Sequence, residues 1–128
     1  MAQGDIYSID VRLKNTSRTG ASSSEIVRIN NDSIVLSAIV SFAVNSEVSG
    51  GKYGKIELLN SNDDFFHRFF YRSASGDVAW ELSELPAMKK IKLNAGEQLQ
   101  FIAHADYNSD PVWHNTTYLH AKITLMEV

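Results

Sequence analysis

The 128-residue sequence contains no cysteine, which excludes disulfides, thiol nucleophiles and thiolate metal sites together. Only two prolines are present, and the hydrophobic content of 44% is too high for an extensively disordered chain. Twelve Lys and Arg residues against fifteen Asp and Glu residues give a formal charge of -3, so the chain offers no basic field to a phosphate backbone. We therefore expect no nucleic-acid partner.

Long apolar runs and catalytic motifs are also missing. No apolar stretch is long enough to cross a bilayer as a helix, and the first residues do not have the charged and apolar regions of a secretory signal. No Gly-x-Ser-x-Gly elbow presents an activated serine, and no glycine-rich loop could cradle a phosphate. These absences predict a non-enzymatic protein that uses no cofactor, has no membrane partner and is made in a cytoplasm.

The clearest positive signal is the alternation between Ser33 and Asn45. A period of two places successive side chains on opposite faces of an extended chain, and a helix would instead spread them around its whole surface. The segment therefore predicts a strand at the centre of a sheet, with one mixed face and one fully apolar face formed by Ile34, Leu36, Ala38, Val40, Phe42 and Val44.

Shorter alternating segments follow along the rest of the chain, separated by turn signals rich in Asn, Asp, Gly and Ser. They predict a single all-β domain over residues 1–128, with eight or nine strands arranged as a sandwich or a barrel. Residues 1–4 are expected to form a short N-terminal arm, and residues 15–24 a mobile loop, because that loop has almost nothing to bury. The other strands are expected at residues 5–14, 25–29, 52–59, 65–72, 78–83, 89–93, 98–106 and 118–128, with hairpins joining 25–29 to 33–45 and 98–106 to 118–128.

The segment 65–72 carries more aromatic side chains than one buried face can use: Phe65, Phe66, Phe69, Phe70 and Tyr71. Either this strand is buried on both faces or it forms a subunit interface. Self-association would bury the excess apolar surface, so we expect a homo-oligomer with these five residues at its interface.

Two histidines are candidates for a metal pair. If the last hairpin is symmetric about its loop, His104 lies opposite His120, with Asp106 close enough to be a third ligand. The alternative is two exposed histidines on a sheet surface or in a subunit contact. A metal site needs at least three convergent ligands with supporting contacts, and only the pair is indicated, so we expect no metal site.

The loop between the last two strands concentrates aromatic, amide and carboxylate groups. Sugars bind by stacking their apolar faces on Trp or Tyr while Asn and Asp bond their hydroxyls, so the loop is a candidate glycan site. The alternative, which we prefer, is that the tryptophan packs inward as an anchor and the polar residues make turns. The candidate ligand-binding residues are Tyr107, Asn108, Asp110, Trp113 and Asn115.

The last third of the chain contains an apolar-x-x-Gly-x-x-apolar-x-apolar segment, formed by Leu93, Gly96, Leu99 and Phe101, and the final strand closes the sequence. This combination resembles the jelly-roll and sandwich accessory proteins of bacteriophage virions, of the decoration or fibre type. The same motif occurs in tumour-necrosis-factor-like trimers and in many binding modules. The resemblance implies an antiparallel β-sandwich with a jelly-roll-like arrangement of about eight strands. It also implies a structural protein located in the virion, often trimeric, which contacts itself and capsid or tail proteins.

Overall fold

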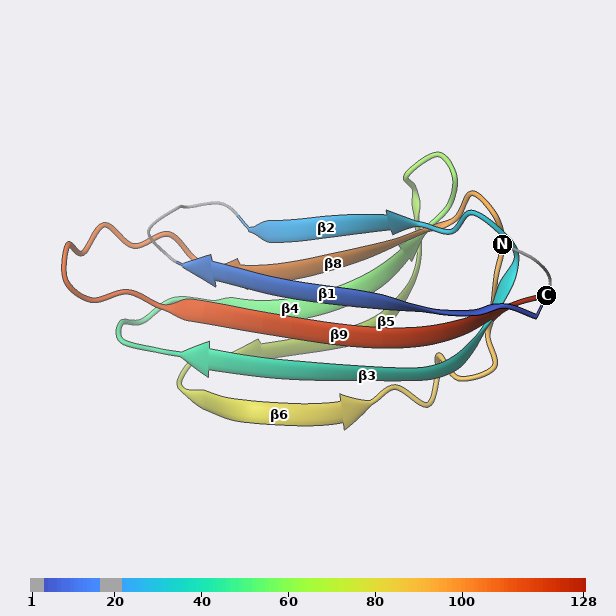
Figure 1. Cartoon of the computed structure of the whole chain (residues 1–128). Coiled ribbons are helices and arrows are strands. Elements are labelled where there is room, and N and C mark those ends of the chain that lie inside the picture. The colour runs from blue at the N-terminus through green and yellow to red at the C-terminus, as the bar shows by residue number, and fades with distance from the viewer. Residues whose placement is uncertain (1–3, 17–21) are drawn as a thin grey trace.

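The computed structural model of the chain describes residues 4–16 and 22–128, which form strands packed face to face as two sheets (Figure 1). Alternating apolar residues give each strand a face that must be covered, and the second sheet covers it. The strands are β1 (Ile6–Thr16), β2 (Ser23–Arg28), β3 (Ser33–Asn45), β4 (Lys52–Leu59), β5 (Phe65–Ala74), β6 (Val78–Glu84), β7 (Lys92–Leu93), β8 (Gln98–Ala105) and β9 (Thr116–Glu127).

The strand order is that of a jelly roll. One sheet has the order β1-β9-β3-β6, with the short β7 also paired to β3, and the other has the order β2-β8-β4-β5. Every pairing is antiparallel. A five-stranded and a four-stranded antiparallel sheet packed together in this strand order form a jelly-roll sandwich, so the predicted fold class is confirmed.

Both predicted hairpins are wrong. β2 and β3 belong to different sheets, as do β8 and β9: β8 pairs with β2 and β4, whereas β9 pairs with β1 and β3. The chain crosses from one sheet to the other at each of these connections. Alternation identifies a strand and its apolar face, but it carries no information about which neighbour completes the hydrogen bonds.

The core lies between the sheets and is built from the inward positions of the long strands. Its largest fully buried side chains include Phe42, Ile56, Phe101, Leu119 and Ile123. The inner face of β1 is the one expected from its alternation, with Ile9 and Val11 buried and Ser8 and Asp10 exposed. Burial of these residues is the main force that holds the sandwich together.

A β-bulge changes the buried face of β3. Val35 pairs with Leu125 and Ser37 with Thr124, which leaves Leu36 as an extra residue in β3. Before the bulge the odd-numbered Val35 is buried, and after it the even-numbered residues from Ala38 onward are buried. The prediction of a central strand is therefore confirmed, because β3 lies between β9 and β6, but the prediction of one apolar face along its whole length is wrong.

The predicted loop 15–24 is shorter than expected at both ends. β1 continues through Thr16 and β2 begins at Ser23. Asn15 is buried, and its side-chain oxygen accepts a 2.9 Å hydrogen bond from the backbone nitrogen of Ala105. Residues 17–21, where mobility was expected, and residues 1–3 of the arm lie outside the described residues.

The connections between strands gather at the two ends of the sandwich (Figure 1). Those after β3, β5 and β8 lie at one end, and the chain termini lie at the other. Along one side, β5 ends its sheet and β6 ends the other, so two consecutive strands form a lateral edge. Among the residues that the structure describes, none belongs to a helix long and apolar enough to cross a bilayer.

Candidate functional site

The lateral edge formed by β5 and β6 is the first candidate site. In the described part of the chain, β5 is paired only with β4 and β6 only with β3. An edge strand leaves backbone N–H and C=O groups available to another chain, and proteins usually protect such edges with charge, bulges or coverage. The pairing of β5 with β4 contains two register shifts of this protective kind.

The aromatic side chains of β5 divide into exposed and packed groups. Phe65 is 59% exposed, Phe66 67% and Tyr71 50%. Phe69 and Phe70 pack against the core, and the ring centroid of Phe70 lies 6.4 Å from that of Phe42. The interpretation of β5 as a strand buried on both faces is therefore wrong, while the subunit interface stays a prediction.

An apolar groove runs beside the exposed aromatic residues. Phe66 and Phe69 of β5 line it together with Leu58 of β4 and Ile91, which precedes β7. Its volume is about 380 Å³. One side of the molecule thus carries both protruding aromatic rings and a groove of a size that admits one or two large side chains.

A charged pair closes the gap between the two edge strands. The Arg72 side chain of β5 donates two hydrogen bonds to the Glu81 carboxylate of β6, at 2.9 and 3.1 Å. These bonds lower the pKa of Glu81 and raise the pKa of Arg72. The Arg72 guanidinium also lies 6.0 Å from the centre of the Phe42 ring. The Arg72–Glu81 pair therefore covers the core at the lateral edge between β5 and β6.

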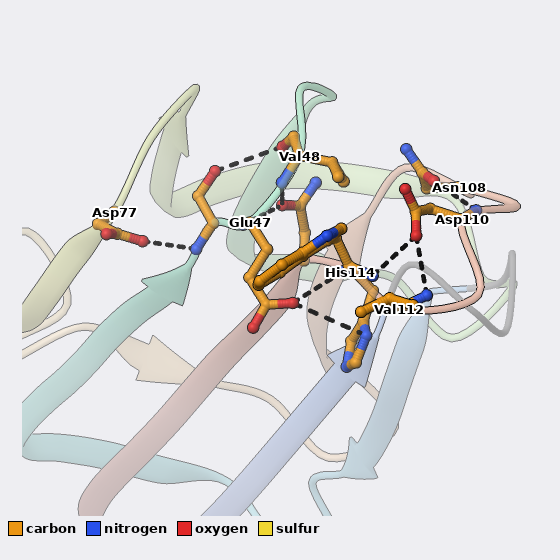
Figure 2. Close-up of polar contacts among 10 residues, drawn as sticks. Glu47, Val48, Asp77, Asn108, Asp110, Val112 and His114 are labelled. Atoms are coloured by element: carbon orange, nitrogen blue, oxygen red, sulfur yellow. Dashed lines mark hydrogen bonds and ion pairs between the residues drawn. The ribbon is translucent and has the colours of Figure 1, made fainter.

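The loop end of the sandwich is the second candidate site, and Figure 2 shows polar contacts between its connections. Asn115 is fully buried, and its side-chain oxygen accepts hydrogen bonds from the backbone nitrogens of Glu47, at 3.0 Å, and Val48, at 3.2 Å. In return, the carboxylate of Glu47 accepts a 2.9 Å bond from the backbone nitrogen of His114. The β8–β9 connection is thereby locked to the β3–β4 connection.

The polar side chains within the β8–β9 connection shape the loop itself. One carboxylate oxygen of Asp110 accepts bonds from the backbone nitrogens of Val112 and Trp113, at 2.8 and 2.9 Å (Figure 2). The side-chain oxygen of Asn108 accepts a 2.7 Å bond from the nitrogen of Asp110. The polar residues do make turns, as preferred above, but Trp113 is 56% exposed, so its expected role as an inward anchor is wrong. Tyr107 is exposed as well.

A buried lysine, Lys52, stabilises the loop end of the sandwich. The Lys52 amine donates to the hydroxyl of Ser46 at 2.9 Å and to the carbonyls of Val48 and Ser75, at 3.4 and 3.0 Å. Burial lowers the pKa of Lys52. Lys52 was not among the site residues predicted from the sequence. Its inward orientation could have been predicted, because Lys52 lies on the same face of β4 as the inward-facing Gly54 and Ile56, at every second residue.

The two histidines lie on different sheets, so the expectation that they face each other across a hairpin is wrong. His104 stacks on Tyr53 at 4.7 Å, and its ring nitrogens contact the Ser22 hydroxyl at 2.5 Å and the Asp106 carboxylate at 2.6 Å. The contact with His104 lowers the pKa of Asp106. His120 contacts Asp10 at 3.0 Å. Within residues 4–16 and 22–128, no cluster of three or more His, Cys, Asp or Glu side chains could hold a metal ion.

The outer face of the β1-β9-β3-β6 sheet carries residues that the sequence analysis missed. Trp80 and Leu82 of β6 point outward and are among the most exposed apolar residues described, whereas Glu81 between them pairs with Arg72. Trp80 contacts Tyr118 of β9, with ring centroids 5.6 Å apart. The alternation of β6 was visible in the sequence, but an alternating edge strand does not reveal which of its faces is turned to the core.

Comparisons with known proteins give likenesses of fold only. No protein-family model matches the sequence, and no curated protein matches it. Three similar solved structures are the infectious bursal disease virus Gx strain, Desmodium yellow mottle tymovirus, and a CocE/NonD family hydrolase from Staphylococcus aureus.

The virus Gx strain is 11% identical with a TM-score of 0.44, and the match covers 98% of this chain and 33% of that one. The tymovirus is 7% identical with a TM-score of 0.39, covering 99% of this chain and 90% of that one. The hydrolase is 9% identical with a TM-score of 0.43, and the match covers 98% of this chain and 34% of that one. The chain thus spans about a third of the length of the first of these structures. Because one fold serves many functions, function has to be argued from the site.

Proposed function

We propose that the chain is a non-enzymatic structural protein of a virion, located in the particle, where it acts by self-association and by contacts with capsid or tail proteins. The observation that carries the proposal is the β5 edge, where Phe65, Phe66 and Tyr71 are exposed beside an apolar groove. Jelly-roll sandwiches are a common building unit of viral capsids, which supports a virion role as a matter of fold class.

The size of the exposed surface is consistent with weak self-association. At 50 to 67% exposure, the three aromatic side chains of β5 present roughly 120 Å² each, about 350 Å² in total. A standard interface buries about 800 Å² per partner, so these residues would form its apolar centre and not its whole area. Burying about 350 Å² on each of two copies contributes roughly 17 kcal/mol before costs, against an association penalty of about 4–15 kcal/mol.

The edge has the complementary parts that a contact between copies needs. The groove lined by Leu58, Phe69 and Ile91 can receive an exposed phenylalanine from a second copy, and each copy carries both parts. If the exchange is mutual, the product is a two-fold dimer. If it runs head to tail, the product is a ring such as a trimer when the rotation between copies closes, and an open filament when it does not. We propose the ring, in keeping with the trimers expected from the sequence resemblance.

The non-enzymatic part of the proposal is supported by what the polar groups do. Ser22, His104 and Asp106 are in contact in the order of a nucleophilic triad, but Asp106 is mostly exposed and its second oxygen accepts a bond from the Gly51 nitrogen. A triad works in a site that excludes water and holds donors for an oxyanion. These contacts instead tie the end of β8 to the β3–β4 connection.

Sedimentation velocity tests self-association directly. We expect wild-type protein to form oligomers at micromolar concentration, and the double variant Phe65→Ser/Phe66→Ser to weaken the assembly by at least tenfold while keeping the wild-type circular dichroism spectrum. The matched control is Tyr107→Ser/Val112→Ser, which removes two residues that are each 64% exposed but lie away from β5. A monomeric wild type at several hundred micromolar, or equal effects of the two variants, would refute the proposal.

A carbohydrate-binding role for the β8–β9 loop is the second candidate. The exposure of Trp113 and Tyr107 on a rigidly held loop favours it. Against it, the side-chain oxygens that would bond sugar hydroxyls already accept backbone hydrogen bonds in Asn108, Asp110 and Asn115. On a glycan array, saturable binding that Trp113→Ala abolishes would support this role, and binding unaffected by that change would exclude the loop.

A further inference from the structure

A row of side chains crosses the outer face of the β1-β9-β3-β6 sheet. Trp80 of β6 is 60% exposed, and its ring is inclined at 43° to that of Tyr118. On the other side of Tyr118, the amine of Lys14 lies 5.9 Å from the centre of the tyrosine ring.

These residues line a groove of about 340 Å³, together with Arg12 and His120. The volume lies at the lower end of the range of small-molecule sites, which begins at about 300 Å³. The ring centroids of Trp80 and Tyr118 are 5.6 Å apart and the Lys14 amine lies 5.9 Å from the Tyr118 centroid, so the row from Trp80 to Lys14 is at most about 11.5 Å long. A disaccharide has about this length.

The charge of the groove favours an anion. Its nearby carboxylate, Asp10, already contacts Arg12 at 3.4 Å and His120 at 3.0 Å. Among the described residues, no carboxylate forms an ion pair with Lys14. The lysine amine therefore remains available beside an aromatic surface.

We propose that this groove binds an acidic oligosaccharide, with the apolar face of a sugar ring on Trp80 and Tyr118 and the carboxylate of a hexuronic acid at Lys14. Aromatic rings accept the apolar faces of sugars, and a lysine amine forms a charge-assisted bond with a carboxylate. The inference goes beyond the proposed function, since β5, which would carry self-association, belongs to the other sheet.

The two tryptophans of the chain make the experiment specific. Trp113→Phe leaves Trp80 as the only indole, and Trp80→Phe leaves Trp113. Each variant is titrated with two matched pairs of disaccharides: digalacturonate and galabiose, and dimannuronate and mannobiose. Within each pair the sugars share linkage and ring configuration and differ only in carboxylates.

We expect at least one acidic disaccharide to change the fluorescence of the Trp113→Phe variant saturably, with a millimolar dissociation constant, and to leave the Trp80→Phe variant unchanged. The neutral counterpart should bind about tenfold more weakly, as expected for the loss of one charge-assisted bond. Adding Lys14→Gln to the Trp113→Phe variant should abolish that difference. Lys89→Gln, at an exposed lysine outside the groove, should preserve it.

Three results would overturn the inference. The first is the absence of a saturable change in Trp80 fluorescence with either acidic disaccharide up to about 50 mM, a concentration at which a binding free energy of only a few kcal/mol gives a detectable complex. The second is a response confined to Trp113, which would transfer sugar binding to the loop. The third is a Trp80 signal that changes with protein concentration and not with sugar, because a second copy would then cover the groove. Sedimentation of the same variants keeps this outcome separate from self-association through β5.

Discussion

Replacing Gly54 with alanine tests the most closely packed point between the two sheets. Gly54 faces inward from β4, and a β-carbon added to it would lie 2.9 and 3.0 Å from two ring carbons of Phe42 and 3.3 Å from a methyl group of Leu119. Ordinary carbon contacts begin at about 3.5 Å. Phe42 and Leu119 are each 1% exposed, so neither side chain has free space into which to retreat.

The cost follows from overpacking. Inserting a methyl group into a well-packed core destabilises proteins by about 1–3 kcal/mol. For a chain of this size, 1 kcal/mol corresponds to roughly 3–5 °C in Tm, so we expect Gly54→Ala to lower Tm by about 3–15 °C. Urea unfolding should show a lower midpoint with an unchanged slope, because the surface exposed on unfolding is nearly the same.

Gly76→Ala is the matched control for this substitution. Gly76 lies in the turn between β5 and β6, and an added β-carbon there has no atom within 4 Å. We expect its effect to stay within about 0.5 kcal/mol, as for most exposed positions. If Gly54→Ala is as stable as the wild type, or if the two alanine variants lose the same stability, Phe42 does not pack on Gly54 and the described contact between the sheets is wrong.

Two further substitutions test the polar contacts. Asn115→Ala removes the acceptor of the Glu47 and Val48 amides, so we expect a loss of about 2–4 kcal/mol in the free energy of unfolding and faster hydrogen exchange at both amides; unchanged exchange would contradict the loop lock. The bond from Arg72 lowers the pKa of Glu81 in the folded protein. The pair therefore contributes fully to the free energy of unfolding above the ordinary glutamate pKa of about 4.3, and this contribution is lost as the pH falls through the lowered pKa of Glu81. Thermal unfolding should therefore show wild type more stable than Glu81→Gln at pH 7, with the difference shrinking toward pH 3; a constant difference would show that the pair contributes nothing.

The candidate sites were only partly predictable from sequence. The excess of aromatic residues in 65–72 was visible in the sequence, but only the structure separates the exposed Phe65, Phe66 and Tyr71 from the packed Phe69 and Phe70. In the 107–115 loop, the residue types indicated turns, and Asp110 makes them. The exposure of Trp113 depends on the neighbouring connection that holds the loop, and no local pattern encodes it.

The sequence by itself determined most of the strands and most of their inward faces, because a period of two in side-chain polarity is a local property of an extended chain. The expected strand 89–93 was wrong for the most part, because residues 86–90 form turns and only Lys92–Leu93 pair as β7. Only the tertiary structure decided which strands pair, since backbone hydrogen bonds are alike for any two strands and the choice depends on how both sheets bury their apolar faces together. That choice separated His104 from His120, placed the bulge at Leu36 and turned Trp80 outward beside Tyr118. These are relations between segments distant in sequence.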